Sequence, residues 1–232
     1  MRRITVLSIL FISSGCAEKS SDAGEDTGGA PSTDTGDETN TDTGEEANTD
    51  SGDDTDTDSI QLGDFHEGGV VFYVDESGFG LIASVTDLGV ADWATLDAVV
   101  PDAYNEAIGG GEDNTNNAIN HMGSTGAYAV HLTYNATDRG QSDWYLPSKD
   151  ELWELMLNKE IVDESSLLNG GEPLVSGAFY WSSTQTISDP RYVYGAYSEM
   201  WDTSGNSVGP YAATNSKNEG MYVRAIRTFV TD

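Results

Sequence analysis

The pattern of apolar and polar positions in residues 142–158 predicts a short strand, a sharp corner and a helix. Residues 144–146 (Trp-Tyr-Leu) form the strand, and Pro147 disfavours helical conformation at the residue before it. Ser148 and Glu151 have the spacing of a capping box, in which each side chain satisfies a free backbone N–H group at a helix start. Apolar positions then recur at helical spacing: Leu152, Leu155 and Met156, widened by Trp153 and Leu157. This pattern predicts a docked amphipathic helix.

Four other stretches have the pattern of strands. Residues 70–74 and 80–84 are apolar runs on either side of turn-forming residues 75–78, which predicts a hairpin. Residues 179–184 open with three aromatic residues, so we expect a buried central strand. Residues 221–227 alternate, with apolar residues on both faces, which predicts one strand inside a sheet.

The remaining stretches divide into helices and loops. Residues 114–120 and 127–134 are expected to be helical. Residues 85–113, around an apolar island at Trp93, and residues 160–178 are expected to be loops, and the 190–211 region a long-loop face.

The first residues resemble a bacterial lipoprotein leader. Within residues 1–15, two arginines precede an apolar run that is too short to span a bilayer. Small residues directly before Cys16 resemble a lipobox, which implies cleavage before Cys16 and lipidation of that residue. Ala17 favours outer-membrane or cell-surface placement over retention in the inner membrane. An ordinary cleaved signal with an incidental cysteine is the alternative.

Residues 16–59 predict a disordered acidic tether. They contain no aromatic residue and few aliphatic ones, so they cannot offset the entropy of ordering. An eight-residue repeat begins at residues 33, 41 and 49, but it lacks the Asp spacing of a calcium-binding loop. As a flexible coil the tether would span roughly 35–40 Å. Residues 60–232 would then form the single folded domain.

The charge of that domain restricts its partners. Residues 60–232 contain 25 Asp and Glu against 7 Lys and Arg, a net charge of −18. This acidity argues against nucleic acid and anionic lipid surfaces as partners, so the membrane would be reached only through the lipid anchor. Because Cys16 is the only cysteine, the domain has no internal disulfide.

Four motifs in order resemble the domain at the C-terminus of the bacterial Lcl collagen-like adhesin. They are GGVVFYVD at 68–75, GGEDNTNNAI at 110–119, SDWYLPSKDELWEL at 142–155, and YWSST at 180–184 followed by VRAIRTF at 223–229. The resemblance implies an α+β, C-type-lectin-like fold: a central antiparallel sheet, two flanking helices and long loops. The namesake binds sulfated polysaccharides as a trimer. This chain departs from it because the domain is acidic and lacks a collagen repeat.

Two groups of candidate ligand-binding residues lie in the second half of the domain. Exposed aromatic side chains could stack on sugar rings: Tyr192, Tyr194, Tyr197, Trp201 and Tyr211. Carboxylates could bind calcium if their loops converge: Glu172, Asp189, Glu199 and Asp202. The simpler expectation is that these acids are solvated side chains on loops and that the domain binds no cofactor. Trp144, Trp153, Tyr180 and Trp181 are expected to pack in the core. Arg224 and Arg227 are expected to pair with acids, with Asp150 and Glu151 as plausible partners.

The motifs of common enzymes are missing from the sequence. His66, His121 and His131 do not have the His-Glu-x-x-His spacing of a zinc site, and there is no Gly-x-Ser-x-Gly elbow or P-loop. A Ser-His-Asp triad built from distant positions stays open, since triads are defined by geometry. The leading hypothesis is a non-catalytic, lipid-anchored surface protein whose lectin-like module binds a glycan or an extracellular protein. The alternative is a structural or assembly component of an envelope complex or homo-oligomer.

Overall fold

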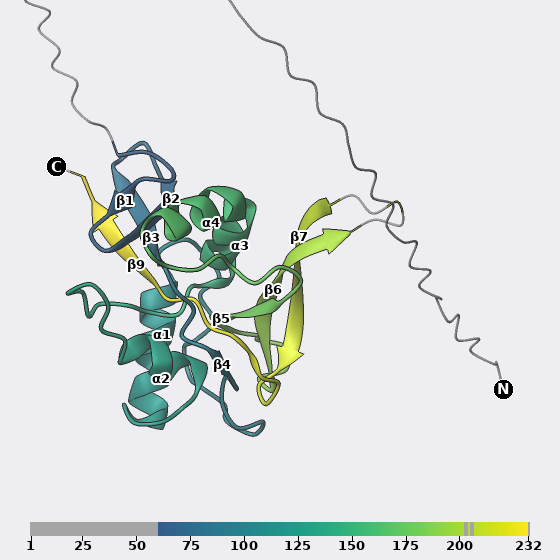
Figure 1. Cartoon of the computed structure of the whole chain (residues 1–232). Helices are drawn as coiled ribbons and strands as arrows, with labels where there is room; N and C mark the ends of the chain where they lie inside the picture. The colour runs from purple at the N-terminus through teal and green to yellow at the C-terminus, as the bar shows by residue number, and fades with distance from the viewer. Residues whose placement is uncertain (1–59, 202–203, 205–206, 232) are drawn as a thin grey trace, which may run out of the picture. The chain divides into compact units, whose positions relative to one another are not determined.

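The computed structural model describes residues 60–201, 204 and 207–231 (Figure 1). The leader, Cys16 and the tether, all predicted from sequence, lie outside this part. Its strands form two sheets. The first sheet is antiparallel and has the order β1-β2-β3-β9. Its strands are β1 (Phe65–His66), β2 (Gly69–Val74), β3 (Phe79–Ser84) and β9 (Ile226–Val230). The predicted hairpin of residues 70–84 is therefore confirmed.

The second sheet has the order β4-β8-β5-β6-β7. Its strands are β4 (Val90–Ala91), β5 (Phe179–Gln185), β6 (Tyr192–Trp201), β7 (Ser207–Ser216) and β8 (Met221–Tyr222). β5 lies in the middle of this sheet and is almost fully buried, as its aromatic run predicts. It pairs with β8 in parallel and with β6 in antiparallel orientation.

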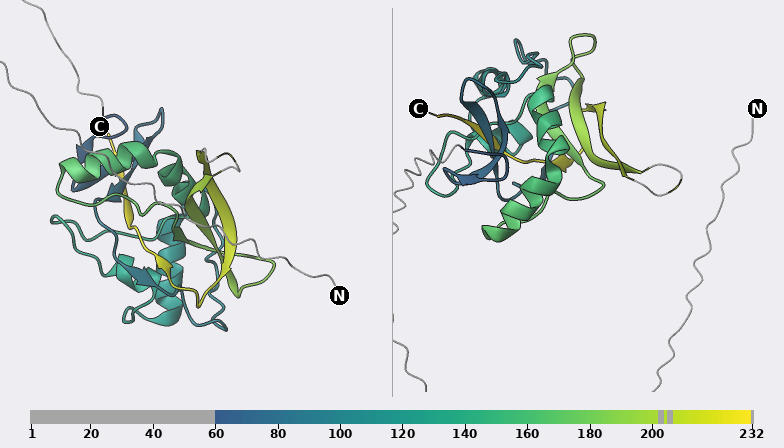
Figure 2. Two further views of the ribbon diagram at one scale, coloured as in Figure 1. Left: turned by 45° about the vertical axis from the view of Figure 1, so that its right-hand side comes forward. Right: turned by 90° about the horizontal axis from the view of Figure 1, so that it is seen from above.

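Four helices accompany the sheets in the described residues: α1 (Gly111–Met122), α2 (Ala129–Tyr134), α3 (Lys149–Leu157) and α4 (Lys159–Leu168). The helices predicted at 114–120 and 127–134 are confirmed as α1 and α2. In both views of Figure 2, α3 lies between the two sheets, and it contacts β2 of the first sheet and β5, β6 and β7 of the second.

The predicted capping box is present at the start of α3. The Ser148 hydroxyl accepts a hydrogen bond from the Glu151 N–H (3.2 Å), and the Glu151 carboxylate accepts one from the Ser148 N–H (2.7 Å). The same carboxylate accepts from the Gly109 N–H (2.8 Å) and from the Tyr145 hydroxyl (3.3 Å). Burial raises the pKa of Glu151 although these donors favour the charged form. The predicted strand before the helix is reduced to one bridge, between Tyr145 and Ile226.

The predicted fold class is wrong. An α+β, C-type-lectin-like fold was expected to have one central antiparallel sheet and two flanking helices. The described residues instead form two separate sheets and four helices, and the second sheet contains a parallel pair.

The prediction of a single strand over residues 221–227 is wrong for a related reason. The segment divides into β8, in the second sheet, and the start of β9, in the first. Between them the Val223 carbonyl accepts from the Leu88 N–H (2.8 Å), and the Ala225 carbonyl accepts from the Ser84 N–H (2.9 Å). Alternation along the sequence is the same whether a strand stays in one sheet or crosses to another.

Two of the predicted loops are regular structure. Residues 160–178 contain most of α4, in which Val162 is the one fully buried apolar side chain and Leu168 is exposed. In the 190–211 region, residues 192–201 and 207–211 belong to the paired strands β6 and β7. Small residues such as Gly195 and Ala196 have little strand propensity of their own, and the cross-strand pairing determines their conformation.

Aromatic residues from separate parts of the chain connect the core. Trp93 and Trp181 are fully buried, and their indole N–H groups donate to Ser182 and Ala91 carbonyls at 2.9 Å and 2.8 Å, respectively. Of the aromatic residues predicted to pack, Trp144, Tyr180 and Trp181 are buried, whereas Trp153 is half-buried. All three apolar clusters draw their buried residues from between Val70 and Phe229, so this part of the chain holds a core of its own.

Candidate functional site

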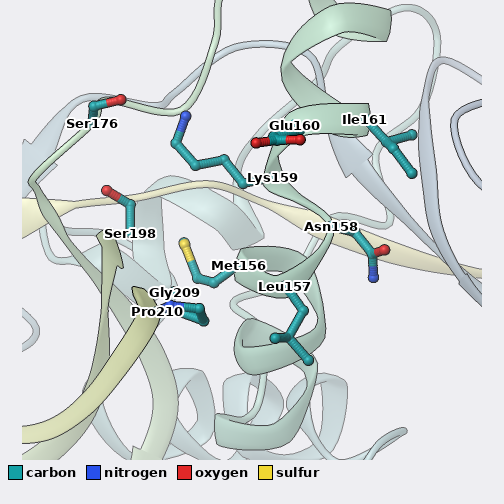
Figure 3. A pocket seen from close by; sticks show the side chains of 10 residues that line it. All are labelled: Met156, Leu157, Asn158, Lys159, Glu160, Ile161, Ser176, Ser198, Gly209 and Pro210. Atoms are coloured by element: carbon teal, nitrogen blue, oxygen red, sulfur yellow. The ribbon is translucent and has the colours of Figure 1, made fainter. Parts of the chain in front are cut away.

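An open groove of about 460 Å³ lies between the α3–α4 junction and the β6–β7 hairpin (Figure 3). The helix side of the groove comprises residues 156–161. The opposite side comprises Ser176, Ser198, Gly209 and Pro210. The groove is larger than a second hollow, of about 260 Å³, beside Tyr145.

Asn158 fixes the helix side of the groove. It ends α3 and begins α4, and its side-chain amide donates to the carbonyls of Glu154 (3.0 Å) and Phe72 (3.1 Å). The second bond fastens the junction to β2. The next residue, Lys159, forms an ion pair with Asp163 one turn further along α4, and the other carboxylate oxygen of Asp163 accepts from the Leu174 N–H (2.7 Å). This bond ties α4 to the segment that carries Ser176.

The opposite side is held by Ser198 of β6. Its hydroxyl donates to the Val175 carbonyl (2.8 Å) and accepts from the Ala178 N–H (3.3 Å). Gly209 has a φ of 94°, a backbone conformation that residues other than glycine rarely adopt, and it is followed by Pro210. Hydrogen bonds between side chains and the backbone, made by Asn158 on one side and by Ser198 on the other, therefore hold both sides of the groove.

The groove combines an apolar surface with a residual negative charge. Met156 extends from α3 toward Ser198 and Pro210, and Lys159 extends from α4 toward the side of Ser176 (Figure 3); Met156 is buried. Because Asp163 neutralises Lys159, Glu160 contributes the net charge among the lining residues that the structure describes. Such a groove suits a neutral or basic group with an apolar part.

The aromatic residues predicted to bind ligand do not form one cluster. Tyr192 and Tyr194 pair with Ser216 and Thr214, whereas Tyr211 pairs with residue 197. Because successive side chains on a strand point to opposite faces, Tyr192 and Tyr194 share one face and Tyr211 is on the other. The Tyr194 ring lies 5.3 Å from the Lys149 ammonium group. The side chains of Tyr197 and Trp201 lie outside the described residues.

The acids predicted to bind calcium lie in different settings. Glu172 accepts a hydrogen bond from the Asp87 N–H (3.0 Å). Asp189 forms an exposed ion pair with Arg191, which lowers its pKa to about 2. The Glu199 side chain and Asp202 lie outside the described residues. In the residues that the structure describes, no three His, Cys, Asp or Glu side chains are grouped as a metal site.

The partners predicted for the two C-terminal arginines are wrong. Arg224 pairs with Asp87 (2.7 Å), and Arg227 pairs with Asp143 (2.8 Å) and Glu67 (2.8 Å). Asp150 and Glu151 lie closer in sequence, but their helix turns them elsewhere: Asp150 toward Lys149 and Glu151 toward its own cap.

Lys217 is a buried residue that the sequence pattern did not single out. Its ammonium group donates to the Ala98 carbonyl and to the side-chain oxygen of Gln185, and it lies 4.6 Å from the centre of the Trp93 ring. Burial lowers its pKa to about 8. A lysine beside Asn and Glu in a turn looks like a surface residue, so no local signal predicts this contact.

The histidines are separate from the groove. The His131 ring contacts the Gly123 carbonyl (3.0 Å), and the His66 ring lies edge-on to Phe229. None of the helices in residues 60–201 or 207–231 has the length and hydrophobicity needed to cross a membrane.

Comparison with known proteins leaves the family of the chain open. No protein-family model and no curated protein matches it. Among solved structures it is similar to a fimbrial protein from Bacteroides ovatus, with 16% identity and a TM-score of 0.47. The match covers 63% of this chain and 35% of that protein, so the chain spans about a third of its length. A likeness this weak establishes neither a shared fold nor a shared role.

Proposed function

We propose that this chain is an exported, lipid-anchored surface protein whose folded domain recognises an extracellular polypeptide without chemical turnover. The observation that carries the proposal is the groove between the α3–α4 junction and the β6–β7 hairpin. It is preformed, because its sides are held by hydrogen bonds from Asn158 and Ser198. Preformed concave sites with an apolar surface and a few polar groups are typical ligand sites.

The lining favours a polypeptide over a sugar. Leu157, Ile161 and Pro210 provide accessible apolar surface, and none of the lining residues that the structure describes is aromatic. Sugar sites commonly rely on the flat face of an aromatic ring. The acid at Glu160 and the net charge of −18 over residues 60–232 favour a neutral or basic partner.

A glycan ligand is the second candidate. Tyr192 and Tyr211 are 37% and 50% exposed, so each offers ring surface to solvent. They lie on different faces of the sheet, so they would form two separate contacts rather than one sugar cradle.

The anchoring part of the proposal comes from the leader. The apolar run before Cys16 and the acidic tether after it would hold the domain away from a bacterial envelope. The ordered motifs that resemble the Lcl-type domain support a binding role, and we keep membership of that family as a proposal. The similarity to a fimbrial protein is too weak to add support.

The absence of turnover is supported by the groove lining. The side chains that could act as acid or base there are Lys159, which is paired with Asp163, and Glu160. In the described part of the chain, no histidine or cysteine is among the lining residues.

The direct test uses the chain from Ala17 to Asp232, which keeps the whole core. Its binding to panels of purified extracellular proteins and of glycans is measured beside two variants. Ser176→Trp fills the groove from an exposed position, and Ser124→Trp adds the same bulk at an exposed site between α1 and α2. We expect protein ligands that bind the parent chain and Ser124→Trp equally but bind Ser176→Trp at least tenfold more weakly.

Two results contradict the proposal. One is the absence of binding to either panel. The other is binding that Ser176→Trp leaves unchanged, which would place the ligand site away from the groove.

A further inference from the structure

β7 is an edge strand of the second sheet, and its outer side has no partner strand among the described residues. It is ten residues long and pairs with β6 on its inner side. Figures 1 and 2 show it at the margin of the second sheet. An unpaired edge presents a row of backbone N–H and C=O groups that can pair with another strand.

The hydrogen bonds of β6 show which residues of β7 face outward. The Tyr192 carbonyl accepts from Thr186 and the Ser198 N–H donates to Ala178, so even-numbered residues of β6 bond toward β5. Odd-numbered residues therefore bond toward β7, as the bond from the Lys217 N–H to the Arg191 carbonyl shows.

Because Ala213 and Asn215 of β7 pair with odd-numbered residues of β6, their backbone groups face β6. Those of Ala212 and Thr214 face away from the sheet. Pro210, which has no N–H group, occupies another even-numbered position, where no bond to β6 is lost.

The usual protections of an edge are missing from residues 211–216. Natural edge strands carry charged side chains, prolines or bulges that prevent pairing. Residues 207–216 contain no charged side chain, and the proline and the left-handed glycine lie at the start of the strand, before residue 211. Residues 211–216 therefore form a strand edge without charged side chains or proline.

The charge of the domain determines which part of it a second copy can approach. With a net charge of −18 over residues 60–232, most faces of two copies repel each other. Five of the seven basic side chains already pair with acids of their own chain, so they do little to relieve this repulsion. The β7 edge is a place where two copies can meet through backbone hydrogen bonds without bringing charged strand residues together.

We propose that residues 212–216 of β7 pair antiparallel with the same residues of a second copy, with Thr214 opposite Thr214 across a two-fold axis, so that the outward-facing residues meet and the second sheet continues from one copy to the other. Such an interface is self-complementary, as two-fold symmetry requires. A five-residue pairing buries less surface than a standard stable interface, so the dimer is weak in solution, with a Kd on the order of tens of micromolar. Anchoring to a common surface would raise its population.

The main experiment is sedimentation equilibrium on the chain from Ala17 to Asp232, from micromolar to several hundred micromolar. Thr214→Pro removes one outward N–H group and no bond to β6, a change that edge strands tolerate. Thr214→Ala is the matched control because it keeps the N–H group. We expect the parent chain and Thr214→Ala to dimerise alike and Thr214→Pro to dimerise at least tenfold more weakly. Raising the salt concentration should strengthen the dimer, because it screens repulsion between the acidic copies.

A second measurement is independent of the proline variant. Thr214→Cys, in a chain that otherwise begins after Cys16, should form a disulfide-linked dimer on oxidation much faster than Ser124→Cys. A parent chain that stays monomeric throughout overturns the proposal, as do equal crosslinking rates. If Thr214→Pro loses its native circular dichroism, the crosslinking rates decide. Neither measurement involves an extracellular ligand, so failure here is distinguishable from failure of the proposed function.

Discussion

Arg224 and Asp87 form a buried ion pair where the chain passes from the second sheet to the first. The Arg224 Nε atom lies 2.7 Å from an Asp87 carboxylate oxygen, and the two side chains are 0% and 5% exposed. Arg224 also donates to the Ser84 carbonyl at the end of β3 (2.8 Å), and the Tyr180 hydroxyl in β5 donates to Asp87 (2.8 Å). The pair therefore joins one strand of each sheet.

Replacing one partner of this pair should destabilise the domain strongly. Arg224→Met leaves Asp87 buried without its cation, and breaking a buried pair from one side costs about 3–5 kcal/mol. Urea unfolding at pH 7 measures the loss. Arg191→Met is the matched control, since its ion pair with Asp189 is exposed, and its unfolding midpoint should not change measurably. Equal midpoints for the two variants would contradict the assigned role of Arg224.

Removing both charges should cost less than removing one. In a chain with Asp87→Leu and Arg224→Met, no unpaired charge stays buried, so its stability should exceed that of Arg224→Met alone. A double variant that is less stable than Arg224→Met would show that the hydrogen bonds to Ser84 and Tyr180 matter more than the charges.

Lys217 should make the domain more stable as the pH rises above neutrality. Burial lowers the pKa of the Lys217 ammonium group to about 8 in the native chain. Between pH 8 and the ordinary pKa of a lysine, the unfolded chain therefore binds a proton at this residue that the native chain has lost. The free energy of unfolding should therefore rise by about 1.4 kcal/mol per pH unit at most, and by about 1.5 kcal/mol between pH 8 and 9.5, because the native side chain is still half protonated at pH 8. Urea unfolding at several pH values measures this slope.

Lys217→Met is the control for that slope. The variant has no proton to lose at this position, so the rise between pH 8 and 9.5 should disappear. A rise of the same size in the variant would assign it to another group.

Ser148 should contribute more than an ordinary helix cap. Its hydroxyl accepts from the Glu151 N–H and also donates to the Ala107 carbonyl (2.8 Å), and the side chain is fully buried. Ser148→Ala should lower the free energy of unfolding by about 1–3 kcal/mol, because a cap and a buried hydrogen bond are lost together. Ser77→Ala, at an exposed turn, should leave thermal unfolding nearly unchanged. Equal effects would mean that the cap is dispensable.

Cys16 should carry the lipid that holds the protein at the envelope. In cells that process lipoproteins, the chain should incorporate radiolabelled palmitate and sediment with membranes. Cys16→Ser should remove both the label and the sedimentation, whereas Ser14→Ala should retain both. Label-free parent protein would favour the ordinary cleaved signal instead.

Local patterns predicted the elements that local energies determine. The capping box of Ser148 and Glu151, the β2–β3 hairpin and helix α1 follow from spacing and turn residues within a few positions of one another. The burial of Trp181 likewise follows from its apolar run. The groove was not predicted, because Met156 and Pro210 are far apart in sequence and no pattern relates them.

The sequence by itself therefore determined the capped helix, the main hairpin, the acidic charge and the absence of common catalytic motifs. Only the tertiary structure decided that residues 221–230 serve two sheets, that Arg224 pairs with Asp87 and that β7 leaves one edge open. The physical reason is that propensity and periodicity act over a few residues along the chain. Sheet membership and burial of a charge instead depend on groups that meet only after the chain has folded.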